Sequence, residues 1–173
     1  MKKNKLSFLV SVSFILSFAF SAFAQSEFND PNTEYTFSLP EDVWKMTVKP
    51  STISPNVEYI YNYRKEGHLE IRKLDIPKDS LYSDIIRKEE AGLQFLPGYI
   101  AGKEENFRGN YSGKVFNYGY LSSGNPYSGR FYFLKTSPTT IYILRFRGEK
   151  DSLMSIRNQT DSIARTFKLK ADN

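Results

Sequence analysis

The sequence predicts an α+β fold, in which an antiparallel sheet of about six to eight strands lies between two main helices. Apolar residues recur at every second position in several short runs separated by turn residues, as in antiparallel strands. Two consecutive runs, 127–135 and 140–147, are apolar on both faces, which places their hairpin inside a sheet covered on both sides. Two segments, at about 80–95 and 151–167, have apolar residues at helical spacing and would supply the covers, giving an α/β/α sandwich.

The first 24 residues have the layout of a cleavable secretory signal. An apolar run at 6–20 follows three lysines and precedes small residues at an A-x-A spacing, which predicts cleavage between Ala24 and Gln25. The run is shorter than the roughly 20 apolar residues of a spanning helix, and serines interrupt it. No cysteine follows it. We therefore expect an exported protein, periplasmic or extracellular in a bacterium, with no lipid anchor and no membrane span in the mature chain.

Composition narrows the function classes further. Removing the three lysines of the signal lowers the formal net charge from +5 to +2, which gives no reason to expect a nucleic-acid partner. The absence of cysteine excludes thiol catalysis and thiolate metal sites. Length predicts one domain at 35–170, preceded by a flexible polar leader at 25–34.

The elements before the first helix are short. A strand beginning at Tyr35 stops at Pro40, and a second covers 44–49. A hairpin follows, in which Tyr59, Tyr61 and Tyr63 alternate along one strand, residues 69–76 return, and Glu66-Gly67 forms the turn. The tyrosine stripe is either core under a helix or an exposed surface for glycans or protein. The helix at 80–95 begins after Asp79 or Ser80, either of which can cap it.

The second half predicts a four-strand meander over 99–107, 114–121, 127–135 and 140–147, and then the final helix with Asp151 as its cap. If 136–139 is the loop of the last hairpin, Lys135 faces Thr140. In this register Arg130 faces Arg145, and Arg147 follows on the same face. Two opposed arginines repel unless an acid or an anion lies between them. The three arginines are therefore the candidate binding residues, for a carboxylate or phosphate group of a partner; the alternative is internal pairing with Glu149 or Asp151.

Two stretches resemble the PsbP/Mog1/DcrB-like proteins. The opening Phe37-Ser38-Leu39-Pro40 followed by Trp44 is similar to their apolar, Leu-Pro, Trp opening. Residues 140–167 are similar to their C-terminal strand and helix. The resemblance covers most of the mature chain and implies a non-enzymatic binding or assembly module. The chain differs from the lipoprotein members because it has no cysteine to carry a lipid.

The sequence offers no catalytic, metal or cofactor motif. His68 is the only histidine, and its place beside the Glu66-Gly67 turn predicts an exposed residue. Serine-acylation, dinucleotide and phosphate-loop patterns are absent. The acid pairs at 41–42, 89–90 and 104–105 are expected to be solvated charges.

Three functions remain open. The first is an exported accessory protein that binds a protein partner in the cell envelope. The second is a carrier of a small apolar or anionic ligand, which needs a deep cavity between sheet and helix. The third is an enzyme whose site is assembled from distant residues with perturbed pKa values.

Overall fold

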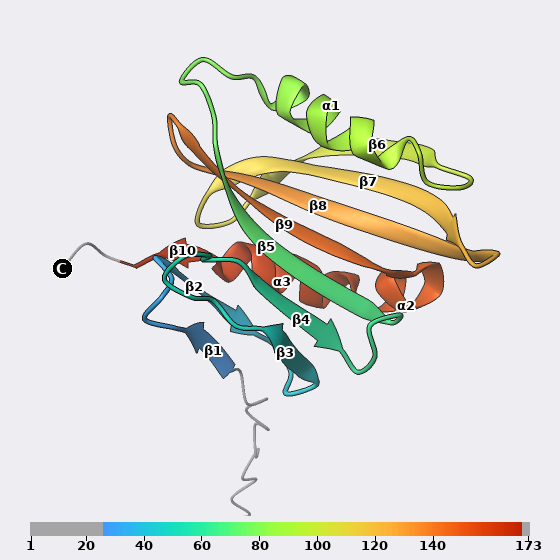
Figure 1. Cartoon of the computed structure of the whole chain (residues 1–173), viewed down its shortest axis with the longest axis horizontal. Coiled ribbons are helices and arrows are strands. Elements are labelled where there is room, and N and C mark those ends of the chain that lie inside the picture. The colour runs from blue at the N-terminus through green and yellow to red at the C-terminus, as the bar shows by residue number, and fades with distance from the viewer. Residues whose placement is uncertain (1–25, 171–173) are drawn as a thin grey trace, which may run out of the picture.

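The computed structural model describes residues 26–170, so the predicted signal and its cleavage site at Ala24 and Gln25 lie outside the described residues. A seven-stranded antiparallel sheet forms the centre of the fold (Figure 1). Its strands lie in the order β3 (Trp44–Val48), β4 (Val57–Tyr61), β5 (Gly67–Asp75), β9 (Thr140–Glu149), β8 (Asn125–Ser137), β7 (Ser112–Ser122) and β6 (Ile100–Arg108). The predicted hairpin, β8 and β9, is central, as its two apolar faces indicated.

Different elements cover the two faces. Helix α1 (Tyr82–Leu93) lies on one face, and helices α2 (Lys150–Ser155) and α3 (Arg157–Thr166) lie on the other (Figure 1). A small sheet of β1 (Ser26–Asn29), β2 (Tyr35–Leu39) and β10 (Lys168–Leu169) packs beside α3 on this second face. The predicted α+β fold class is confirmed. The small second sheet was not predicted, because the strand at Tyr35 carried no signal for its neighbours.

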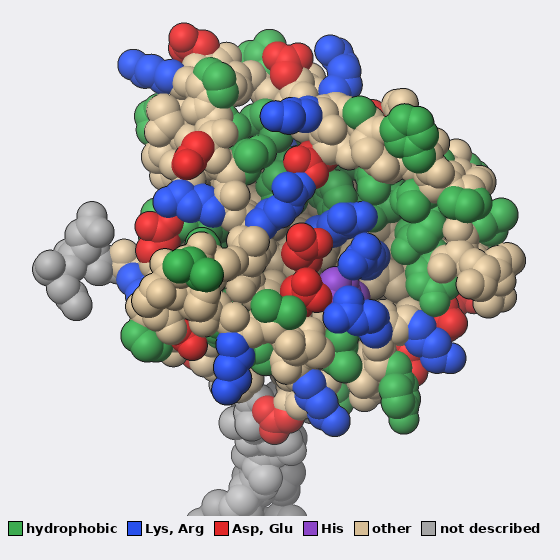
Figure 2. All heavy atoms as spheres, in the orientation of Figure 1, with side chains coloured by type: hydrophobic (Ala, Val, Ile, Leu, Met, Phe, Trp, Pro, Cys, Tyr) green, Lys and Arg blue, Asp and Glu red, His purple; other side chains and the backbone are tan. Residues whose placement is uncertain are grey.

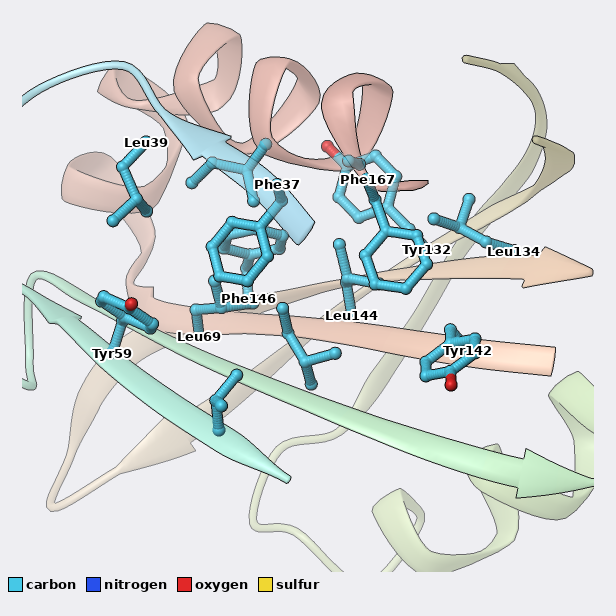
Figure 3. Close-up of a cluster of buried hydrophobic side chains, with 14 of the residues drawn as sticks. Phe37, Leu39, Tyr59, Leu69, Tyr132, Leu134, Tyr142, Leu144, Phe146 and Phe167 are labelled. Atoms are coloured by element: carbon cyan, nitrogen blue, oxygen red, sulfur yellow. The ribbon is translucent and has the colours of Figure 1, made fainter. Parts of the chain in front are cut away.

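The larger core fills the space between the central sheet and α3 with the small sheet. Its side chains come from alternate positions of the central strands, from β2 and from the end of α3 (Figure 3). They include Phe37, Leu39, Tyr59, Leu69, Tyr132, Leu134, Tyr142, Leu144, Phe146 and Phe167. Tyr59 belongs to this core, whereas Tyr63 lies outside β4 and is 68% exposed, so the tyrosine stripe is divided.

The second core lies under α1. Ile85, Ile86 and Leu93 of this helix pack on Phe133 and Ile143 and their neighbours on the opposite face of the sheet. The helix begins after Leu81 without a side-chain cap, so the predicted caps Asp79 and Ser80 are wrong.

The predicted flexible leader at 25–34 is wrong from Ser26 onwards. Ser26–Asn29 forms β1, which pairs antiparallel with β2 from Ser26 opposite Leu39 to Asn29 opposite Thr36. Phe28 is buried and stacks on Phe37 with ring centroids 4.8 Å apart. A single apolar side chain among polar neighbours anchors the strand, which is too weak a pattern to detect by alternation.

The predicted register of the β8–β9 hairpin is wrong by one residue. A bulge between Lys135 and Ser137 places Lys135 opposite Ile141, so Arg130 faces Phe146 and Arg145 faces Phe131. Since side chains alternate, a slip of one residue exchanges the faces of a strand. Arg145 and Arg147 therefore lie on the α1 side of the sheet, and Arg130 lies on the α3 side.

The final helix is interrupted rather than continuous over 151–167. Ile156 leaves the helical conformation between α2 and α3, with φ −96° and ψ 14°, and its side chain is buried in the larger core. Glu149, not Asp151, precedes the first helical residue. Within residues 26–170, none of the helices has the length and apolar character needed to cross a membrane.

Candidate functional site

Part of the sheet face under α1 is left open by this helix. Figure 2 shows the only histidine in a hollow of this face, between basic and acidic side chains. We call this region the open face and define it by side chains from β4, β5, β7, β8 and β9. These are Glu58, His68, Glu70, Tyr120, Tyr127, Arg145 and Arg147.

Strand register explains how these side chains come together. One row across four adjacent strands runs Tyr118, Gly129, Arg147, His68. The next row runs from Phe131 through Arg145 and Glu70 to Glu58. Members of a row share a face of the sheet and lie within side-chain reach of their neighbours. Residues separated by up to 89 positions in sequence, Glu58 to Arg147, thus form one polar surface.

His68 is at the centre of the open face and is only 1% exposed. Arg147 donates from Nε to His68 Nδ1 at 3.0 Å, so Nδ1 carries no proton. The other nitrogen, Nε2, therefore carries the proton and donates to Glu58 Oε2 at 2.7 Å. Arg64 lies 3.0 Å from the same nitrogen through Nη1 and donates through Nη2 to Glu58 at 3.3 Å. These partners fix a neutral imidazole in one tautomer.

The electrostatics agree with this assignment. Burial lowers the pKa of His68, and the guanidinium groups of Arg147 and Arg64 lower it further, against the opposing effect of Glu58. Burial would raise the pKa of Glu58, but the hydrogen bond from His68 and the hydrogen bond and charge of Arg64 together bring it below its usual value. The predicted exposed position of His68 is therefore wrong. The turn ends at Glu66, and β5 begins at Gly67 with paired strands on both sides.

Arg145 and Arg147, two of the three arginines predicted to bind a partner, differ in their pairing. Arg145 lies 3.9 Å from Glu70 and places its guanidinium 5.1 Å from the centre of the Phe131 ring. Its Nε is buried without a hydrogen-bond partner, and so is the hydroxyl of Tyr118 on the same face. Arg147 has no carboxylate of residues 26–170 within 4.0 Å. It is thus a cation held by a neutral histidine.

Arg130 does not belong to the open face. It is buried on the α3 side, where it pairs with Asp161 at 2.9 Å and donates to the Tyr132 hydroxyl at 2.6 Å and to Asn117 at 2.7 Å. Internal pairing is correct for this residue, although the partner is Asp161 and not Glu149 or Asp151. The predicted cluster of three arginines is therefore a cluster of two.

A pocket of about 360 Å³ opens beside Arg147. It is lined by Arg64, Lys65, His68, Tyr120, Tyr127, Arg147 and Gly148. The turn carrying Arg64 and Lys65 lies on the end of β9, where Glu149 N donates to Lys65 O at 2.6 Å. A side chain at Gly148 would place its Cβ 2.6 Å from Glu66 O, so glycine permits this close approach.

The other polar groups are structural or exposed. Of the acid pairs expected to be solvated, Glu89 instead forms an ion pair with Arg72, and Glu90 accepts from Tyr99 at 2.8 Å. Within the described chain, no group of three His, Cys, Asp or Glu side chains is arranged to hold a metal ion. His68, Glu58 and the tyrosines of the open face were missed as site residues. Their only sequence signal was an even spacing along strands whose neighbours were unknown.

Comparisons with known proteins support the fold. No family model matches the sequence, and neither does any curated protein. Among solved structures, cyanobacterial PsbP from Synechocystis is similar over 84% of this chain and 92% of its own, with 12% identity and a TM-score of 0.61. A variant of Mog1 matches over 84% and 95% of the two chains, with 9% identity and a TM-score of 0.61.

A third similar structure is LpqN of Mycobacterium tuberculosis, described as involved in cell envelope biogenesis. It matches over 85% of this chain and 92% of its own, with 15% identity and a TM-score of 0.54. The chain therefore has a PsbP/Mog1-like fold, as the resemblance of its two ends indicated.

Proposed function

We propose that the protein is an exported, non-enzymatic accessory protein of the bacterial cell envelope that binds a protein partner through the open face. The observation that carries the proposal is a cluster of half-buried tyrosine and arginine side chains on a part of the sheet that no helix covers. Tyrosine and arginine are enriched among the residues that dominate binding at protein interfaces. Tyr120 and Tyr127 lie 5.5 Å apart by ring centroids, beside Arg147.

Large apolar side chains are exposed beside this surface, at the β7 end of the sheet. Leu121 and Ile100 point to the opposite face from Tyr120, because Leu121 follows Tyr120 and Ile100 pairs with Gly119. Leu121, at the end of β7 next to Tyr120, is 42% exposed, and its backbone N–H donates to Pro97 O at 2.7 Å. This contact brings the loop after α1 to the β7 end, and the flanking Phe95 and Ile100 are 90% and 70% exposed. Exposed large apolar residues beside a polar hollow are typical of a protein-binding surface.

Export is supported by the opening 24 residues, with cleavage between Ala24 and Gln25. Strand β1 begins at Ser26, so cleavage at this bond would leave the described domain whole. The involvement of the similar protein LpqN in cell envelope biogenesis agrees with this location. The test is the mass of the protein recovered outside the cytoplasm: a chain beginning at Gln25 supports export, and an intact Met1 overturns it.

The two alternatives have less support. A carrier needs a deep cavity, whereas aromatic and aliphatic side chains fill the space on both sides of the central sheet. An enzyme needs a reactive group with a perturbed pKa in a cleft, and His68 with Glu58 meets part of that description. However, both ring nitrogens of His68 already have hydrogen-bond partners, so neither is directed at a substrate.

The experiment is affinity capture of the partner from the envelope fraction, with matched variants of the immobilised protein. Arg147→Gln removes a cation from the open face, and Arg157→Gln removes an exposed cation from α3 on the opposite side. A partner retained by the wild type and the Arg157 variant, and lost by the Arg147 variant, supports the proposal. Equal retention by both variants, or no saturable partner at high loading, overturns it.

A further inference from the structure

The pocket beside Arg147 has an excess of one positive charge. Arg64 is paired with Glu58 at 3.3 Å, Lys65 lies 3.9 Å from Glu149, and Arg145 lies 3.9 Å from Glu70. These pairs leave Arg147 as the cation without a carboxylate among the described residues. A guanidinium offers five donors, and Arg147 uses only Nε within the described chain, toward His68.

The surrounding hydroxyls are also free to bind. Tyr120 and Tyr127 line the pocket, and no acceptor within residues 26–170 is hydrogen-bonded to either hydroxyl. Two further donors of this face of the sheet, Tyr118 OH and Arg145 Nε, are buried and lack partners, but neither lines the pocket. The donors available to a group in the pocket are therefore those of Arg147, Tyr120 and Tyr127.

The position of Arg147 is set independently of any ligand. His68 holds its Nε from one side, and the row of Tyr118, Gly129 and Arg147 crosses three strands without a side chain at the central position. A side chain at Gly129 would overlap the Tyr118 ring, with its Cβ 2.0 Å from Tyr118 Cζ. The glycine thus leaves room for the Tyr118 ring over β8, between the strand of the tyrosine and the strand of Arg147.

We propose that this pocket binds a single carboxylate group, supplied by an acidic side chain or the C-terminus of the partner protein. One uncompensated cation matches a monoanion better than a dianionic phosphate. The planar guanidinium and flanking hydroxyls suit the planar carboxylate, which accepts two parallel hydrogen bonds. This proposal rests on the proposed function for the source of the carboxylate, but the pocket can be tested without the partner.

The test uses the single histidine as a reporter. Because His68 is bonded to Arg147, a carboxylate bound to Arg147 raises the pKa of His68, and the imidazole NMR signals follow it without assignment ambiguity. The probe is a capped three-residue peptide with a central glutamate, and the matched control peptide has glutamine there. Titrations with inorganic phosphate and with chloride at equal ionic strength complete the set.

We expect a saturable response to the glutamate peptide in the millimolar range, and none to the glutamine peptide. Tyr127→Phe and Lys65→Gln, which change exposed or partly exposed groups, weaken binding several-fold, and Arg147→Gln weakens it about tenfold or more. Arg157→Gln on the opposite side leaves it unchanged.

Three results would overturn the pocket: no saturable response, tighter binding of phosphate than of the glutamate peptide, or an unchanged response in Tyr127→Phe and Lys65→Gln. Capture of a partner together with no peptide response would reject the carboxylate pocket and leave the proposed function standing. A peptide response with no partner captured would reject the proposed function and leave the carboxylate pocket standing.

Discussion

Arg147 and His68 are directly opposite each other on β9 and β5 and share a hydrogen bond of 3.0 Å in which the arginine is the donor. Arginine is permanently charged, so the bond exists only while His68 Nδ1 is unprotonated. Protonation of the imidazole would place the new N–H of His68 Nδ1 against the Nε–H of Arg147, beside the guanidinium groups of Arg147 and Arg64. The pair therefore couples the protonation of one buried side chain to the position of the strongest candidate binding residue.

The first prediction concerns the pH dependence of stability. The pKa of folded His68 lies below the usual 6.5, so below that pH the unfolded chain binds more protons than the folded chain. The free energy of unfolding should fall as the pH decreases from 6.5, with a slope of at most about 1.4 kcal/mol per pH unit. Glu58 and Glu34, whose folded pKa values are also lowered, begin to contribute as the pH approaches their unfolded value of 4.5. Urea unfolding between these two pH values measures the effect.

His68→Gln is the control, because glutamine keeps a donor and an acceptor but does not titrate. Its stability should be flat over the same pH range. The charged neighbours Glu58, Arg64 and Arg147 remain in this variant, so a slope that persists would assign the effect to other groups and contradict the neutral imidazole.

The second prediction concerns the buried ion pair on the α3 side. Asp161→Ala leaves the guanidinium of Arg130 without its acid in a nearly buried position and should cost about 3 kcal/mol of stability. Asp161→Asn keeps an acceptor and should cost less. Chemical denaturation of the three proteins measures the difference. If the alanine and asparagine variants are equally stable, an acceptor at position 161 adds nothing to the stability of the protein, and the prediction is wrong.

The third prediction tests the structured start of the domain. Phe28→Ala removes a buried ring from the contact with Phe37 and should cost about 3 kcal/mol. Glu27→Ala, at the adjacent exposed position, should change stability by less than about 0.5 kcal/mol. Thermal unfolding of both variants measures this. If the two variants are equally stable, Phe28 contributes nothing to the fold, as the predicted flexible leader would require.

The fourth prediction uses two glycines with opposite surroundings. Gly148→Ala pushes against Glu66 O and displaces the turn of Arg64 and Lys65, so it should cost about 1 kcal/mol and weaken the response to the glutamate peptide. Gly92→Ala in α1 meets nothing within 4 Å and should stabilise the protein by about 0.5 to 1 kcal/mol. Urea unfolding and the NMR titration together measure the pair. A Gly148 variant with the full peptide response would show that the turn is not part of the pocket.

Sequence periodicity predicted the class of fold because it records burial. The apolar alternation of β8 and β9 on both faces was enough to place them centrally, and the stripes of the two helical segments were enough to place helices on both sides. Periodicity does not record which residues face each other across strands. The bulge at Thr136 moved the register by one residue, which separated Arg130 from Arg145 and sent them to opposite faces.

The candidate site was predictable only in part for the same reason. Arg145 and Arg147 lie on one strand at alternate positions, so their shared face followed from the sequence alone. His68 and Glu58 join them through the pairing of β5 with β9 and β4, which no local pattern specifies. The histidine was assigned to a turn because its burial depends on β9, some 70 residues further along the chain.

The order of strands in space also sets when the molecule can finish folding. The two ends of the described chain meet on β2, where β1 pairs on one edge and β10, at Lys168–Leu169, on the other. Strand β5 likewise has both of its edges paired only after β9 has joined the sheet. Contacts between such distant segments close slowly, because long loops must be ordered before any contact repays the loss of entropy. During synthesis from the amino end, the small sheet would thus stay incomplete until β10 is available to pair with β2. Until then the chain is not fully folded, and an unfolded polypeptide is the form that can pass through a membrane channel.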